Sequence, residues 1–230
     1  MKTAVSGIVS VLLLGPFGSP GGQTTAGAPE GAELAGRVSL TMKSGSVPGE
    51  GTVVWLPDVR PQDPGQEPRL VSKDKRFQPH VLGVEAGTQV TFPNLDKVYH
   101  NVFSLSAPNA FDLGLYRGGA ARSVTLKTPG LVRIYCNIHP DMAAYVMVLD
   151  GSAFAVAGPD GSFHIGGIPP GRHLVKVWNE KGGDQQATLD FAAGKIREYP
   201  LALDASAYRL ISHKNKHGQD YPPVRDEDRY

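Results

Sequence analysis

Hydrophobic and polar residues alternate in short runs along most of the chain, a pattern typical of β-strands with one buried face. The first such run places Val38, Leu40 and Met42 on the same side of a strand. Strands are predicted at Arg37–Met42, Gly51–Leu56, Arg69–Ser72, His80–Val84, Thr88–Phe92, Val98–Leu105, Ala121–Leu126, Leu131–Tyr135, Ala144–Leu149, Phe154–Ala157, Ser162–Ile165, Arg172–Trp178, Ala187–Phe191 and Ile196–Leu203. No convincing amphipathic helix is found. The closely spaced strands predict an all-β chain of antiparallel sandwich type.

Turn residues divide this series of strands into two parts, with a boundary at Asp150. Beyond it, the Pro159-Asp160-Gly161 turn predicts a hairpin between Phe154–Ala157 and Ser162–Ile165. Residues 204–230 are charged, contain prolines and have little periodicity. They predict a mobile or loosely docked tail.

Composition and charge narrow the class of protein. Hydrophobic residues make up 40% of the chain, an ordinary globular share, and 28 Gly with 19 Pro suit short strands joined by turns. The net charge is +1 and no long basic run precedes the tail, so nucleic acid is not an expected partner.

The first 26 residues have the pattern of an export signal. Lys2 gives a positive start, an apolar run leads to Leu14, and small residues at Thr24-Thr25-Ala26 offer a cleavage site. The run is too short to span a bilayer, so no transmembrane helix is expected in the mature protein. A retained membrane anchor is the alternative. Export to the periplasm or the medium is the expectation.

A single cysteine stands in a segment rich in metal-binding side chains. An exported protein with one cysteine makes no internal disulfide, so Cys136 is free, intermolecular or a metal ligand. His139 and Met142 follow it at steps of three residues. Thiolate, imidazole and thioether ligands together select copper, and two histidines, one cysteine and a weak axial methionine form the blue-copper set.

The second histidine of such a set must come from elsewhere in the chain. His100 follows Val98 and precedes Val102 on one face of a predicted strand, which points it toward an apolar wall. Each member of the set also has a plain alternative: Cys136 as a small buried hydrophobe, Met142 as core and His139 as a surface residue. Their joint order favours a mononuclear copper site.

The remaining histidines have weaker patterns. His80, His164 and His173 lie in strand patterns without evident partners and are not expected to bind metal. His213 and His217 are interpreted as part of the solvated tail.

The segment from Phe77 to Asn94, followed by His100-Asn101 and by the spacing of Cys136, His139 and Met142, resembles plastocyanin-like cupredoxins. The short ligand loop is similar to that of amicyanin. The resemblance covers residues 69–149 and implies a Greek-key β-sandwich with type 1 copper. It further implies that Asn101 hydrogen-bonds across to the Cys136 loop, and that Tyr135 offers electrons a second route to the surface.

The flanks of the cysteine argue against an enzyme. Oxidases built on cupredoxin domains commonly place histidines beside the cysteine to connect it with further coppers. Here Tyr135 and Asn137 occupy these positions, and a dinuclear centre needs a second cysteine. No nucleophile elbow, phosphate loop or zinc-protease signature is present.

Residues 150–203, with their motif from Asp160 to Trp178, resemble the carboxypeptidase regulatory-like, or transthyretin-like, sandwich. The segment Ala35–Leu56, within the opening strands assigned to 34–58, resembles the first two strands of the same module. These resemblances imply that the cupredoxin is inserted into that module and that Gly51–Leu56 pairs with strands after Asp150. In the alternative, Arg37–Leu56 extends the cupredoxin sheet.

One-electron transfer is therefore the expected function, with a c-type cytochrome or a dehydrogenase as redox partner. Electrons are expected to enter at the edge of His139, amid Pro140, Ala143 and Ala144. Copper carriage or storage is the second possibility, although only four methionines occur, one of them Met1. A structural protein with a vestigial site is the third.

Overall fold

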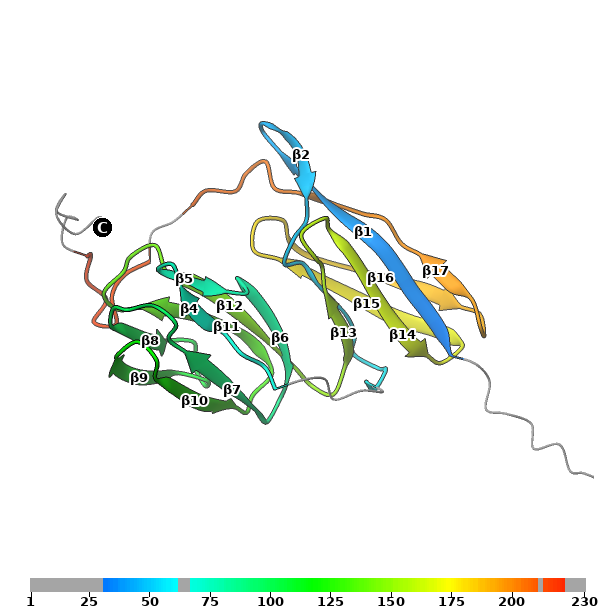
Figure 1. The fold of residues 1–230 in the computed structure, drawn as a ribbon. Helices are drawn as coiled ribbons and strands as arrows, with labels where there is room; N and C mark the ends of the chain where they lie inside the picture. Colours follow the sequence, from blue (N-terminus) through cyan, green and yellow to red (C-terminus); the bar gives the residue numbers. More distant parts are fainter. Residues whose placement is uncertain (1–30, 62–66, 211–212, 222–230) are drawn as a thin grey trace, which may run out of the picture.

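The computed structural model describes residues 31–61, 67–210 and 213–221, which form two β-sandwiches side by side (Figure 1). These residues contain 18 strands and no helix, so none that could span a membrane. The predicted all-β class is confirmed. The expected export signal, residues 1–26, lies outside the described residues.

The central sandwich is built from the middle of the chain. One sheet has the order β6-β12-β11-β8-β9, and smaller pairs β10-β7 and β4-β5 lie opposite, joined by bridges from Arg69 to Thr91 and from Ser72 to Asn94. The strands are β4 (Val71–Lys73), β5 (Arg76–Gln78), β6 (Val81–Glu85), β7 (Thr88–Pro93), β8 (His100–Ser104), β9 (Phe111–Tyr116), β10 (Ala121–Leu126), β11 (Gly130–Cys136) and β12 (Ala143–Leu149).

The flanking sandwich combines the two ends of the described chain. In one sheet, β1 pairs with β2, β14, β17 and β18, and the other sheet has the order β13-β3-β15-β16. The strands are β1 (Ala32–Met42), β2 (Gly45–Pro48), β3 (Val53–Leu56), β13 (Ala153–Val156), β14 (Ser162–Ile168), β15 (Gly171–Asn179), β16 (Gly183–Phe191), β17 (Ile196–Glu198) and β18 (Leu201–Asp204).

Strand β3 shows how the two sandwiches are connected. It pairs with β13 through Val54 and Ala155, and with β15 through Val53 and Trp178. The pairing predicted between Gly51–Leu56 and strands after Asp150 is thus confirmed. The chain leaves the flanking sandwich after β3, builds the central sandwich and returns through β13.

The predicted hairpin after Asp150 is wrong. The turn itself forms, with the N–H of Gly158 donating to the carbonyl of Ser162 at 2.9 Å. However, β13 pairs with β3 while β14 pairs with β1, in the opposite sheet. Ala153 and Phe163 both point into the core between the two sheets. Because the turn crosses from one sheet to the other, both strands bury their apolar faces in that core.

Two smaller expectations also need correction. The strand predicted at Ile196–Leu203 is two strands separated by Tyr199 and Pro200, because proline has no N–H to donate to a sheet. The alternation pattern missed β2 and β5, which are only four and three residues long, and β9, in which Phe111 and Leu113 are only partly buried against the core. Such strands are too short, or bury their apolar side too incompletely, to give a clear alternation of apolar and polar positions.

A small apolar cluster joins the two sandwiches. Val81, Met147 and Leu149 of the central sandwich pack with Val53 and Trp178 of the flanking one. Beside the cluster, Glu180 accepts hydrogen bonds from His80 at 2.7 Å and from the Tyr145 hydroxyl at 3.0 Å. The two bodies therefore share a buried contact in addition to their covalent links.

Candidate metal centre

The site lies at one end of the central sandwich, where β8 and β11 are antiparallel neighbours. Their register sets Cys136 opposite Val102 and Tyr135 opposite Phe103. His100 at the start of β8 and Cys136 at the end of β11 therefore meet at the same end of the sheet. Both are fully buried. The apolar wall expected around His100 is formed by Val102, whereas Val98 is 39% exposed because it precedes the strand.

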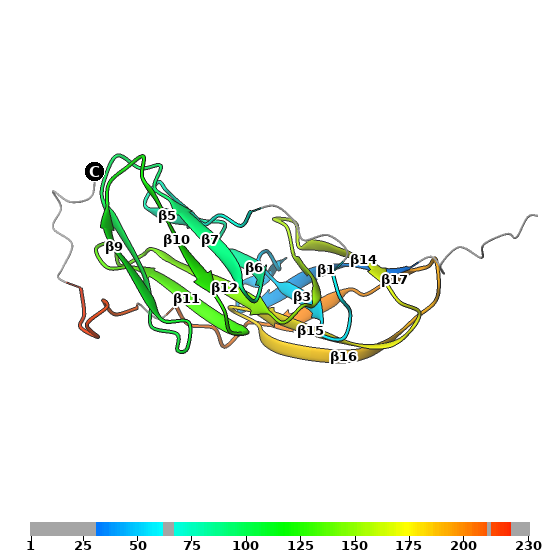
Figure 2. The ribbon, with the colours of Figure 1, turned by 90° about the horizontal axis from the view of Figure 1, so that it is seen from below.

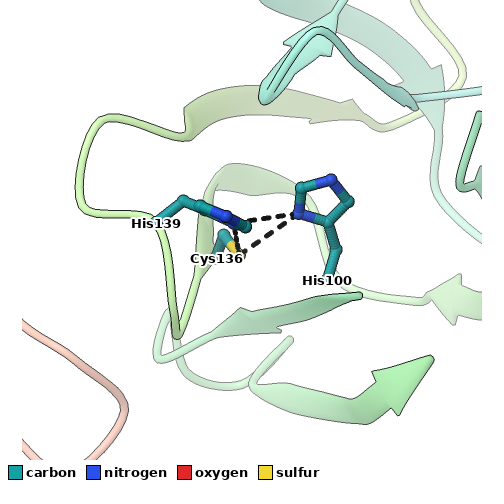
Figure 3. A group of neighbouring side chains, drawn as sticks. All are labelled: His100, Cys136 and His139. Atoms are coloured by element: carbon teal, nitrogen blue, oxygen red, sulfur yellow. Dashed lines mark hydrogen bonds between the residues drawn. The ribbon is translucent and has the colours of Figure 1, made fainter. Parts of the chain in front are cut away.

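Three of the predicted residues converge on one point (Figure 3). The Nδ1 atoms of His100 and His139 lie 3.1 Å apart, and the Cys136 Sγ lies 3.8 Å from the first and 3.5 Å from the second. Ligand atoms held ~2.0–2.3 Å from one ion at angles of about 100–120° lie roughly 3.1–3.8 Å apart. The donor set and its spacing therefore fit a single metal ion. No other group of three such donors occurs in the described part of the chain.

The loop from Cys136 to Met142 is closed by its own backbone. The N–H of Cys136 donates to the carbonyl of Met142, and the N–H of Met142 donates to the carbonyl of His139, each at 3.1 Å. Met142 is fully buried and belongs to the same core cluster as Cys136. The loop thus brings His139 over the cysteine and keeps Met142 at its base. The axial role of Met142 remains a prediction.

A carboxylate that the sequence analysis missed orients His100. The Nε2 of His100 donates to Asp96 Oδ2 at 2.7 Å, which leaves Nδ1 with a free lone pair toward the site. Burial opposes ionisation of Asp96, but hydrogen bonds from His100 and from the backbones of Lys75 and Asp74 lower the pKa of its carboxyl. An acidic residue four positions before a candidate ligand is the signal that could have revealed it.

The turn between β4 and β5 holds Asp96 in place. The backbone N–H groups of Asp74 and Lys75 donate to its two oxygens at 2.7 and 3.0 Å. Both residues adopt the left-handed conformation, with φ of 54° and 52°, which turns their N–H groups toward the carboxylate. A hairpin outside the ligand segments therefore supports the orientation of His100.

Burial and hydrogen bonding have opposite effects on the pKa of the Cys136 thiol. Burial raises the pKa of the thiol, while hydrogen bonds from the backbones of Ile138, Asn101 and His139 act to lower it. These N–H groups favour negative charge on the sulfur. A bound cation would add its own charge and hold the thiol deprotonated.

His139 is the more accessible of the two histidines. It is half-buried, and burial followed by the charges of His100 and Lys75 lowers the pKa of its imidazole. Its neighbour Ile138 is 44% exposed, so apolar surface adjoins this candidate ligand. The expectation that Ala144 lies at the surface beside His139 is wrong. Ala144 is fully buried.

Ala143 also differs from the expectation. It is directly opposite Tyr135 in the β11–β12 pair, so its side chain shares the outer face of the sheet with Tyr135. The alternation that buries Ile134 and Cys136 places Tyr135 and Ala143 on that outer face. Ala143 is therefore part of the Tyr135 face rather than of the His139 edge.

The contacts of Asn101 and Tyr135 differ in detail from those that the resemblance implied. Asn101 does join the ligand segments, but through its backbone: its carbonyl accepts from the N–H of Asn137 at 3.3 Å, and its own N–H bonds to the Cys136 sulfur. Its side chain donates instead to Asp112 at 2.6 Å. Tyr135 is half-buried because the ring of His213 stacks on it, with centroids 4.2 Å apart.

The other histidines have partners that the sequence did not reveal. His80 pairs with Glu180, His164 with Glu33 and His173 with Asp58, at 2.7–2.8 Å. None of them belongs to a three-donor cluster among the described residues. His217 is exposed as expected, but the expectation of a solvated His213 is wrong, since this residue packs on the central sandwich.

Fold and site together define a β-sandwich protein with a His–Cys–His cluster at one end, in which His100 and Cys136 are buried and His139 is half-buried. No protein family's sequence profile and no curated protein sequence matches the chain. Among solved structures, it is similar to a copper-containing nitrite reductase from Thermus scotoductus, with 24% identity and a TM-score of 0.35, over 37% of this chain and 23% of that one.

Two smaller copper proteins are similar over a comparable part. A reduced amicyanin variant is 23% identical with a TM-score of 0.34, over 36% of this chain and 84% of its own. A purple cupredoxin from Nitrosopumilus maritimus is 22% identical with a TM-score of 0.32, over 35% and 98%. The chain spans less than a quarter of the nitrite reductase's length. These partial likenesses assign no activity to it.

Proposed function

We propose that this chain is an exported type 1 copper protein that carries single electrons between redox partners. The observation that supports the proposal is the convergence of His100 Nδ1, Cys136 Sγ and His139 Nδ1 at separations that suit one ion. Met142, buried in the same loop, is proposed as the weak axial ligand. Bound copper would supply the one-electron couple between Cu(I) and Cu(II).

The protein's contribution is a site that changes little between the two oxidation states. His100 is fixed by its strand and by Asp96, and Cys136 by its strand and by the backbone bonds that close its loop. Side chains held by packing and by hydrogen bonds of this kind keep a constant ligand geometry. A rigid geometry favours rapid electron exchange over release of the metal.

The exposed edge of the site suits docking of a redox protein. Exposed apolar side chains come from both ligand-bearing loops: Leu95, Val98 and Tyr99 precede His100, and Ile138 adjoins His139. The net charge is close to zero, so long-range steering is weak and contact depends on this local surface. A c-type cytochrome or a dehydrogenase is the proposed partner.

The first test is the absorption spectrum of the oxidised, copper-loaded protein. Thiolate-to-copper charge transfer should give an intense visible band. A colourless protein that binds copper would contradict the type 1 assignment.

The second test separates electron carriage from copper delivery. Ile138→Glu should slow electron exchange with a c-type cytochrome and leave copper affinity unchanged. Leu105→Glu is the matched control: Leu105 is 60% exposed but follows the opposite end of β8, about 16 Å from His100 at ~3.3 Å per residue. If Ile138→Glu instead accelerated copper release to a chelator without affecting electron exchange, copper delivery would be the better account.

A further inference from the structure

The chain beyond β18 returns from the flanking sandwich to the metal end of the central one. Figures 1 and 2 show this last segment beside the loops of the central sandwich, far from the strand that it leaves. On the way, the hydroxyl of Tyr208 donates to Glu180 at 3.0 Å, at the contact between the two sandwiches. Residues 213–221, here called the C-terminal cover, then lie against the end of β11.

The C-terminal cover contacts the two residues that flank the sulfur ligand and the ligand itself. The ring of His213 stacks on Tyr135 at 4.2 Å, with an angle of 21° between the rings. The hydroxyl of Tyr221 donates to the backbone carbonyl of Cys136 at 2.6 Å. The N–H of Lys216 donates to the side chain of Asn137 at 2.9 Å.

A further contact reaches the segment that carries the first histidine. The ammonium group of Lys216 lies 2.6 Å from Asp112 Oδ2, and the other oxygen of Asp112 accepts from Asn101 at 2.6 Å. Asn101 directly follows His100. The C-terminal cover is therefore connected to both ligand-bearing strands, β8 and β11.

The contacts are selective within this short segment. His213, Lys216 and Tyr221 are partly buried against the central sandwich, whereas Lys214 and His217 are exposed. His213 and Tyr221 also contact each other, edge to face, with centroids 5.3 Å apart. The segment thus has an inner side, which contacts the site, and an outer side in solvent.

Tyr135, the residue under the His213 ring, lies directly beside the sulfur ligand in the chain. Tyr135 is bonded covalently to Cys136 and projects from the outer face of β11, away from the core. An aromatic ring so close to the sulfur ligand is a short connection between the site and the surface. The stacked imidazole of His213 occupies the space over that ring.

We propose that the C-terminal cover closes the Tyr135 face and thereby confines electron exchange to the His139 edge. The inference rests on the proposed electron-carrier function and adds a specificity determinant to it. His213 and Tyr221 are positioning residues, and the flanking sandwich serves as the base from which the cover is held. The flanking sandwich thereby helps to determine which surface of the central sandwich exchanges electrons.

The test uses the full-length, copper-loaded protein reduced to Cu(I), with tris(phenanthroline)cobalt(III) as a small oxidant. Each copper gives one electron to one cobalt(III), which becomes cobalt(II), and no proton or group is transferred. The variant His213→Ala with Tyr221→Phe loses the ring stack and the hydroxyl bond. In this variant the C-terminal cover should be detached from the central sandwich in about ten times as many molecules, which is equivalent to ~1.4 kcal/mol. The oxidation rate should rise by the same factor.

Two variants control for general effects. His217→Ala removes an exposed histidine of the same segment and should leave the oxidation rate unchanged. His213→Phe keeps an aromatic ring over Tyr135, so it should restore the slow rate in the Tyr221→Phe background. Adding Tyr135→Leu to the fast variant should remove the gain, because the newly opened route ends at this ring.

Several results would overturn the proposal. An unchanged rate in the double variant would show that the cover closes no route. A gain that persists with Tyr135→Leu would show that the route does not use Tyr135. Loss of the visible band only in the double variant would show that the segment holds the metal instead of covering a face. Absence of the band in the parent protein would refute the proposed function itself.

Discussion

The two sandwiches have the same kind of architecture but different cores. The core cluster of the flanking sandwich consists of aliphatic and aromatic side chains alone. The core cluster of the central sandwich includes Cys136 and Met142 and adjoins the fully buried His100. Both cores bury apolar strand faces, so the difference lies at one end of the central sandwich.

This comparison shows how a β-sandwich accommodates metal donors at low cost. A buried polar group destabilises a fold unless it is hydrogen-bonded. Here two of the donor side chains have partners: Asp96 for His100, and backbone N–H groups for the Cys136 sulfur. The other members of the core cluster that holds Cys136 and Met142 are apolar or aromatic. Folding and metal binding are therefore expected to be separable properties of this chain.

The largest expected effect is that of Cys136→Ser. The substitution removes the only thiolate, so the visible band of the copper-loaded protein should disappear entirely. The sandwich should remain folded because the side chains are similar in size and the surrounding core is unchanged. Visible absorption and far-ultraviolet circular dichroism check the two statements. Colour that persisted in the variant would contradict the assignment of the ligand.

Leu203→Ala should destabilise the flanking sandwich and leave the metal site unchanged. Leu203 is fully buried in the core of the flanking sandwich. A cavity of this kind costs about 2–5 kcal/mol in the free energy of unfolding. The position and intensity of the copper band in folded protein should not change. Denaturant unfolding and absorption spectra provide the measurements, and a shifted band would indicate coupling between this core and the site.

Asp96→Asn should change the reduction potential without removing the metal. The Asp96 carboxylate stabilises the more positive, oxidised site, so its loss should raise the potential by about 60 mV, a tenfold change in the redox equilibrium. Asp74→Asn makes the same charge change at an exposed neighbour and keeps the backbone N–H that contacts Asp96. Its effect should be smaller because solvent screens it. Equal shifts in redox titrations of the two variants would argue against a role for the His100 contact.

The smallest effect concerns the contact between the sandwiches and its dependence on pH. Burial opposes ionisation of Glu180, but the hydrogen bond and charge of His80 and bonds from Tyr145 and Tyr208 hold its pKa below the ordinary 4.5. A lowered carboxyl pKa stabilises the folded state above about pH 4.5, and this contribution is lost as the pH falls through the folded-state pKa.

Glu180→Gln should therefore remove part of the acid dependence of stability in the copper-free protein. The exposed Glu198, changed to Gln, provides the control. Unfolding free energies measured between neutral and acidic pH should show a flatter profile for Glu180→Gln alone. Parallel profiles for the two variants would indicate that the contact contributes nothing to this dependence.

Much of this architecture could be predicted because it depends on local patterns. Alternation located most strands, since burial of one face imposes a period of two. The ligand loop could be recognised because Cys136, His139 and Met142 are close in sequence, and His100 because its strand pattern placed it on an inward face. The predicted ligand histidines and cysteine do lie together in the structure.

The sequence by itself thus determined the all-β class and the candidate donors, while the pairing of β3 with strands beyond Asp150 was one of two alternatives that the structure decided. Only the tertiary structure decided what surrounds those donors. Asp96 reaches His100 because the β4–β5 turn holds it there, and the C-terminal cover reaches Tyr135 from the other sandwich. The residues in these contacts do not belong to a common pattern of alternating apolar and polar positions. They depend on how two folded bodies pack, which no local pattern of hydrophobic and polar positions records.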